Sequence, residues 1–426
     1  MGTSRSNATP NSSLNEGFSP KTSHKHVKTK HPTLKTLQPS RSFFLNHIYQ
    51  TFKFNSTYSN KDDKNNKNIL LYTIPFNPTG HSFISLSKDL TEKAECNVYK
   101  SSETQLFVSY NKGIKQNDLL NKDKFYFLID GGFEVYCLID GHGPFGDLVG
   151  QIVQDKVFLT LNENYSTNFE NQYEEIFIKL FEDIHSNLIN QNIELVDEYD
   201  AYLSGAAVTI IIIKDNVLYT VNIGNVMGLL IHNDYLHLKH KEDSETNINT
   251  SKYEVDLLTI DDSDLFNEFF EKSSKFSKDE FDFLHLHGLF DINEEIRRIY
   301  ENGGEIRQIA GENKGRIFVQ GKYYPGVINT RGLGDQIGEI IGVMHKPHIA
   351  KMKIKNDVEY YLILCTDGVG GFGNVEKILE IFKEHLGNMH FALDAIIHKI
   401  NQKYYGSRYV PDMTLMIKKI YIKENK

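Results

Sequence analysis

The sequence predicts an α+β fold in which antiparallel sheets lie between layers of paired helices. Apolar runs of strand length occur in pairs joined by tight turns. Longer segments with apolar residues at helical spacing also occur in pairs. A sheet with one apolar face buries that face against helices or against a second sheet, so these pairs predict a layered sandwich.

The predicted strands form two hairpins and two later runs. FYFLID and FEVYCLID, residues 125–130 and 133–140, flank a Gly-Gly turn. A second hairpin over 206–224 turns at Lys214-Asp215-Asn216. Apolar runs at 360–368 and 412–422 are also expected to be strands.

Five segments carry the spacing of amphipathic helices. In DLVGQIVQDKVFLTL, for example, apolar residues recur every three or four positions. The segments are 147–161, 169–189, 294–304, which ends in glycines, 376–386 and 390–404.

Composition and length exclude several classes of protein. The longest apolar run, 208–213, has strand length, so no transmembrane helix is expected. No apolar stretch marks a signal peptide. Cys96, Cys137 and Cys365 are too scattered for a disulfide framework, which favours reduced thiols and a cytoplasmic location.

The first 68 residues differ from the rest of the chain. Residues 1–41 hold seven basic side chains and one acid, although the whole chain has a net charge of −9. Residues 1–68 are polar and predict a disordered tail, with the folded domain over 69–424. An acidic body argues against nucleic-acid binding. Gly2 and Ser6 fit the pattern for N-myristoylation. With the basic run at 21–30, they predict contact with an anionic membrane at its inner face; the alternative is a solvated basic tail.

Two predicted strands end in Asp-Gly, at Asp140-Gly141 and Asp367-Gly368. If these ends meet in space, two carboxylates and a backbone carbonyl can hold a hard divalent cation such as Mg²⁺ or Mn²⁺. The alternative is a pair of solvated turns.

Six motifs occur in an order that carries a resemblance. They are LIDGHGPFG (138–146), SGAAVTIIII (204–213), LYTVNIGNVMGLL (218–230), EEIRRIYENGGEIR (294–307), NTRGLGDQIGEIIGVMHKPHI (329–349) and LILCTDGVGGF (362–372). This series resembles the metal-dependent protein phosphatases (PPM, or type 2C). The resemblance implies a four-layer α-β-β-α sandwich, two antiparallel sheets flanked by helix pairs, with two Mg²⁺ or Mn²⁺ ions at one end.

The resemblance also assigns roles to residues. Asp140 would bridge two ions, the Gly141 carbonyl would serve one of them, and Asp367 would be a ligand of the other. Asp123 would be a further metal ligand. His142 would act as the general acid in hydrolysis of phosphoserine or phosphothreonine by a metal-activated water.

Several positions depart from the family pattern. Lys122 stands where the family has an acid or amide, and Asp118 stands where it has a phosphate-binding arginine. Asp118 would serve in place of the acid missing at Lys122 if the alignment slips. Pro411 occupies a metal-ligand position, so Asp412 would have to replace that ligand. Asn225 replaces an acid, and Gly370-Gly371 replaces Trp-Asp. Asp412 can replace the ligand only with a local bulge, because neighbouring strand residues face opposite ways.

Two functions therefore stay open. The domain is a Ser/Thr phosphatase with a partly degenerate site, or a catalytically inactive pseudophosphatase that binds or scaffolds phosphoproteins at a membrane. Insertions are expected near 240–256 and 261–291, the second being a lid or docking surface. Four histidines are expected to be surface or satisfied residues without ligand-like partners: His285, His287, His345 and His348.

Overall fold

A computed structural model describes the larger part of the chain. The described residues are 70–73, 96–101, 104–114, 120–130, 132–164, 169–194, 201–232, 254–263, 266, 293–309, 314–371, 375–385, 387–407 and 409–423. Among them, no helix has the length and apolar character needed to cross a membrane. Outside them lie the expected tail with Gly2 and Ser6, Asp118, His285, His287 and most of both expected insertions.

The first sheet is built on the two hairpins that the sequence predicts. The strands 123–130 and 133–142 pair antiparallel, as do 205–214 and 217–223, and the two hairpins are joined to each other through their inner strands. In spatial order the sheet contains β1 (Leu70–Thr73), β4 (Asp123–Asp130), β5 (Phe133–His142), β6 (Gly205–Lys214), β7 (Val217–Ile223) and β14 (His348–Lys353), with β13 (Leu333–Gly334) beside β6.

A second antiparallel sheet has the last strand of the chain near its centre. Its order is β2 (Cys96–Ser101), β3 (Leu106–Asn111), β16 (Met413–Tyr421), β15 (Glu359–Cys365), β8 (Met227–His232) and β9 (Glu254–Leu257). Residues 254–256, expected to belong to an insertion, thus form most of an edge strand. A small third sheet contains β10 (Gly304–Gln308), β11 (Gly315–Val319) and β12 (Pro325–Val327).

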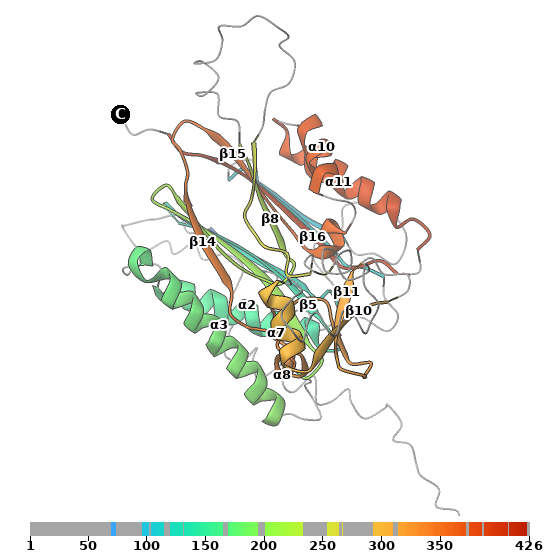
Figure 1. The fold of residues 1–426 in the computed structure, drawn as a ribbon. Coiled ribbons are helices and arrows are strands. Elements are labelled where there is room, and N and C mark those ends of the chain that lie inside the picture. The colour runs from blue at the N-terminus through green and yellow to red at the C-terminus, as the bar shows by residue number, and fades with distance from the viewer. Residues whose placement is uncertain are drawn as a thin grey trace, which may run out of the picture.

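Helix pairs cover the outer faces of the two large sheets (Figure 1). The pair α2 (Gly146–Asn164) and α3 (Phe169–Glu194) packs on the first sheet through Val153, Phe177 and neighbouring side chains. The pair α10 (Val375–Glu384) and α11 (Met389–Lys403) packs on the second sheet through Phe382 and Ile396. The shorter helices are α7 (Glu294–Glu301), α8 (Gln336–Ile340) and α9 (Asp367–Gly370).

A third apolar core lies between the two large sheets. It joins Phe125 and Leu138 of the first sheet to Leu364 and Met416 of the second. Successive side chains of a strand point to opposite faces of the sheet. Tyr126 and Ile139, the next residues after Phe125 and Leu138, therefore face the helices instead. The predicted α+β fold with antiparallel sheets is confirmed.

Candidate active site

Asp123 and Asp140 lie opposite each other on neighbouring strands. The β4–β5 register pairs them directly, two residues beyond the pair Phe125–Leu138. Because Phe125 and Leu138 face the core between the sheets, Asp123 and Asp140 face the same way. The hairpin therefore directs two carboxyl groups towards the second sheet, at the end of the apolar core.

Asp123 is 1% exposed and reaches across to that second sheet. Its Oδ2 accepts hydrogen bonds from the hydroxyls of Thr366 (2.9 Å) and Thr414 (2.7 Å). Its buried Oδ1 has no hydrogen-bond partner among the described residues. Burial raises the pKa of Asp123, the charges of Asp412 and Asp367 raise it further, and the two threonine hydrogen bonds lower it. A buried carboxylate oxygen without a donor fits a cation ligand.

Asp367 and Gly141 lie at the same end of the sheets. Asp367 begins α9 directly after β15 and Thr366, and its charge raises the pKa of both Asp123 and His142. The Gly141 amide donates to the Lys122 carbonyl (3.3 Å). A Cβ at position 141 would lie 2.0 Å from the Gly146 carbonyl oxygen, so only glycine permits this close approach of β5 to the start of α2.

Asp412 lies beside Asp123, but its carboxylate accepts backbone hydrogen bonds. Its Oδ1 accepts from the Gly113 amide (2.8 Å) and its Oδ2 from the Lys122 amide (2.9 Å). Asp412 immediately precedes β16, where the strand pairing has not yet begun. The carboxylate therefore contributes negative charge and holds the segments before β4 and after β3.

Lys122 brings a positive charge to this site. Its ammonium donates to the Gly143 carbonyl (2.8 Å), two residues beyond Gly141, and its charge lowers the pKa of His142. Lys122, which stands where the resemblance expects an acid or amide, thus lies next to the carboxylates of Asp123 and Asp412.

His142, at the end of β5, is held by an acid that sequence reasoning did not single out. His142 Nε2 lies 2.6 Å from Oδ2 of Asp335, which is 2% exposed at its side chain. Burial lowers the pKa of His142, but the charge and hydrogen bond of Asp335 outweigh it, and the pKa is raised. A Cβ at Gly205 would lie 2.3 Å from that Asp335 oxygen, so glycine there leaves room for the pair.

Backbone strain accompanies this pairing. Asp335 has φ 48° and ψ 49°, a left-handed conformation, and it occupies the N-cap of α8 without making a side-chain cap hydrogen bond. Its amide donates to the Ser204 carbonyl (2.9 Å). The only sequence signal for this role was the position of Asp335 in the motif NTRGLGDQIG, 193 residues beyond His142.

A second histidine–aspartate pair lies near the loop after β7. Asp262 accepts from the Gly224 amide (2.7 Å), and its other oxygen lies 2.9 Å from His348 Nε2. The expectation that His348 is a satisfied residue is confirmed. Asn225, which replaces a family acid, accepts from the Asn329 side chain (3.2 Å).

The comparisons with known proteins agree with the motif order. A family model described as protein phosphatase 2C matches residues 289–404. The Arabidopsis thaliana protein named "Probable protein phosphatase 2C 35" is 22% identical over 58% of this chain and 62% of its own length. The chain is a distant homologue of the phosphatase 2C family. It spans less than two thirds of that plant relative.

The fold resembles that of a solved phosphatase 2C. A serine-threonine phosphatase 2C from Toxoplasma gondii has a TM-score of 0.53 at 12% identity, covering 77% of this chain and 99% of its own. The catalytic domain of the serine/threonine protein phosphatase PstP, in complex with two manganese ions, has a TM-score of 0.43 at 15% identity. That likeness covers 74% of this chain and 97% of the PstP chain.

Proposed function

We propose that this domain is a metal-dependent Ser/Thr protein phosphatase that acts on phosphoproteins. Asp123, Asp140, Asp367 and the Gly141 carbonyl would hold Mg²⁺ or Mn²⁺ between the ends of the two sheets. The observation that supports this most is the buried Asp123 carboxylate, whose Oδ1 has no donor among the described residues and which lies opposite Asp140. An all-oxygen set of donors suits these hard cations.

Bound divalent ions would supply an activated water and neutralise charge on the phosphoryl group. The residues of the chain protonate the leaving group and position the acid that does so. His142, held at Nε2 by Asp335, keeps Nδ1 for the seryl or threonyl oxygen that leaves and delivers a proton to it. Asp335 acts as a positioning residue, because it fixes the imidazole and favours its protonated form.

Turnover of a phosphoserine peptide, with and without Mn²⁺, tests the proposal in the wild type and in Asp140→Ala. We expect Mn²⁺-dependent turnover that the substitution abolishes. Asp155→Asn, an acid on α2 away from the site, is the matched control and should retain turnover. Absence of turnover at millimolar Mn²⁺ in a folded wild-type protein would contradict the assignment.

One observation favours the second candidate, a pseudophosphatase that binds phosphoproteins. The Lys122 ammonium lies at the site and can take the place of part of a cation's charge. A protein stabilised by phosphopeptide but not by Mn²⁺ would support this reading, because a ligand that binds only the native state raises the melting temperature.

Replacing Lys122 by glutamine is expected to strengthen Mn²⁺ binding. Two unit charges ~5 Å apart interact by about 3 kcal/mol at an effective dielectric of ~20, so removing the ammonium relieves repulsion of the ion. We expect the Kd for Mn²⁺, measured by calorimetry, to fall at least about tenfold. Lys377→Gln, an exposed lysine on α10, is the charge-matched control. An unchanged Kd in Lys122→Gln would show that this lysine does not oppose the ion.

A further inference from the structure

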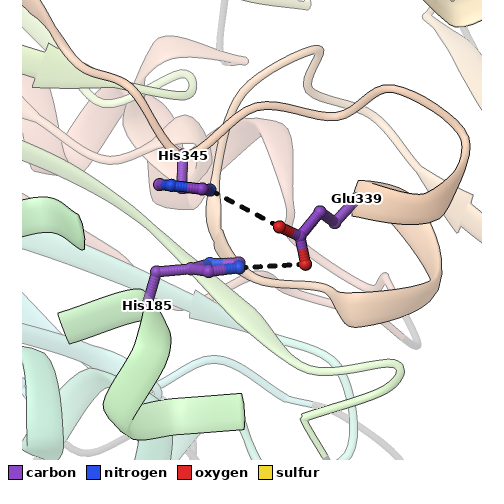
Figure 2. A group of neighbouring side chains, drawn as sticks. All are labelled: His185, Glu339 and His345. Atoms are coloured by element: carbon purple, nitrogen blue, oxygen red, sulfur yellow. Dashed lines mark ion pairs between the residues drawn. The ribbon is translucent and has the colours of Figure 1, made fainter. Parts of the chain in front are cut away.

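Two histidines and a glutamate from three separate segments meet beside α3. His185 lies on α3, Glu339 on α8, and His345 in the loop that precedes β14. Figure 2 shows the two imidazole rings side by side, both facing the Glu339 carboxylate. One possible ligand atom from each residue lies within 4.8 Å of the other two. The expectation that His345 lacks ligand-like partners is therefore wrong, because its partners come from segments far apart in the sequence.

The distances are close to those of a tetrahedral metal centre. His185 Nε2 lies 3.2 Å from one Glu339 oxygen, and His345 Nδ1 lies 3.8 Å from the other. Ligand atoms bound to Zn²⁺ at ~2.0–2.1 Å lie roughly 3.3 Å apart. The imidazoles stack with centroids 4.1 Å apart and planes 14° apart, so the nitrogen lone pairs of the two rings lie in nearly parallel planes. Binding one ion requires a tilt of one ring, which the loop position of His345 permits.

The histidines carry buried nitrogens that the rest of the described structure does not use. His185 is 5% exposed, and neither of its ring nitrogens has a hydrogen-bond partner among the described residues. Its approach to Glu339 lacks the geometry of a hydrogen bond. His345 Nδ1 is also buried, and it has no hydrogen-bond partner among the described residues. A bound cation would satisfy one nitrogen of each ring together with the carboxylate.

The charge state of the cluster suits a metal. Burial and the neighbouring His185 lower the pKa of His345, against the opposing charges of Glu339 and Glu182. A neutral imidazole is the form that ligates, and the carboxylate offsets the charge of the ion. Two imidazoles and one carboxylate suit Zn²⁺, whereas Mg²⁺ and Ca²⁺ prefer sets of oxygen ligands. The Glu339 side chain is 42% exposed, so an ion can enter from solvent.

We propose that His185, Glu339 and His345 form a Zn²⁺ site with a fourth position open to water. The site is separate from the carboxylates between the sheets, and the proposal does not depend on phosphatase activity. Binding would join α3 to α8. Because the Glu339 amide donates to the Asp335 carbonyl (2.9 Å), the ion would stabilise the turn that holds Asp335 against His142.

Zn²⁺ titration of the chelator-stripped full-length chain tests this proposal. Asp140→Asn serves as the parent, so that the carboxylates between the sheets contribute less to binding. Competition with a chromophoric chelator should detect one Zn²⁺ equivalent that Glu339→Gln and His345→Gln lack. Each substitution should lower the affinity for this Zn²⁺ equivalent at least about 100-fold. Loss of a residue that only orients a metal ligand already lowers metal affinity by about 10- to 100-fold. Glu339→Gln changes a half-exposed side chain, so the variant is expected to fold.

A histidine–carboxylate pair on α11 provides the control. His390 Nε2 lies 3.6 Å from Asp394 on α11, where the described structure offers two ligand groups rather than three, and His390→Gln should bind Zn²⁺ as the parent does. Co²⁺ should give the intense visible absorption of a tetrahedral centre in the parent and the control only. Equal Zn²⁺ stoichiometry and affinity in all variants, or the absence of that absorption from the parent, would overturn the proposal.

Discussion

Replacing Asp123 by asparagine is expected to stabilise the metal-free protein and to abolish its response to Mn²⁺. Asparagine has the shape of aspartate, and its carbonyl oxygen can still accept from Thr366 and Thr414. The substitution removes a buried charge close to Asp412 and Asp367. Because a buried charge beside two like charges is costly, we expect the free energy of unfolding at pH 8 to rise by about 1–3 kcal/mol.

The pH dependence has a definite sign. Burial and the nearby Asp412 raise the pKa of Asp123 from 3.8 to about 7, and the proton is therefore held more tightly in the folded state. The contribution of this group to stability is fully present below pH ~4 and is lost as the pH rises towards 7. The stability difference between Asp123→Asn and the wild type, both metal-free, should grow over that interval. Urea denaturation at several pH values measures it.

The same substitution should remove function. Losing a metal ligand forfeits several kcal/mol of transition-state stabilisation, so turnover of a phosphoserine peptide should fall at least about 100-fold. The Mn²⁺-induced rise in melting temperature should disappear as well.

Asp155→Asn is the matched control for Asp123→Asn. Burial raises the pKa of Asp155 to about 6, and this acid accepts from Gln151 on the outer helix layer (2.9 Å). Its replacement should also stabilise the protein but leave the Mn²⁺ response intact. If Asp123→Asn loses stability at pH 8, or retains the Mn²⁺ response, Asp123 is not the buried ligand that we infer.

Local sequence pattern accounts for the four strands of the two hairpins, for β15 and β16, and for the Asp123–Asp140 half of the site. A two-residue turn between Asp130 and Phe133 determines the register of the hairpin, and that register places Asp123 opposite Asp140. The alternation of apolar residues then determines which face the two acids share. The helices that cover the outer faces could likewise be predicted, because their apolar residues recur every three or four positions.

Contacts between distant segments could not be derived in this way. Asp335 reaches His142 because β13, directly before it in the chain, pairs with β6 through Leu333 and Ala206. The position of Asp412 depends on backbone amides at Gly113 and Lys122, which no local pattern specifies. The His185, Glu339 and His345 cluster joins a helix face to a loop, and each residue alone looks like an ordinary surface or core side chain.

Replacing Asp335 by asparagine is expected to slow hydrolysis in a way that depends on the leaving group. Asparagine tolerates the left-handed backbone at this position, so the turn should be retained. The neutral amide cannot hold His142 in its protonated form as the carboxylate does. A seryl oxygen needs a proton to leave, whereas nitrophenolate leaves as a stable anion. We expect kcat for a phosphoserine peptide to fall about 100-fold and kcat for p-nitrophenyl phosphate to change only a few-fold.

His142→Gln should give the same leaving-group dependence as Asp335→Asn, and the double variant should be no slower than either single one, because the two residues act as a unit. His348→Gln disrupts the other histidine–aspartate pair at this end of the molecule and should not distinguish the two substrates. Equal losses on both substrates in Asp335→Asn would mean that Asp335 supports the fold rather than the proton transfer. A selective loss, with KM nearly constant, would identify Asp335 as the residue that positions the acid, since only the step that protonates the leaving oxygen separates the two substrates.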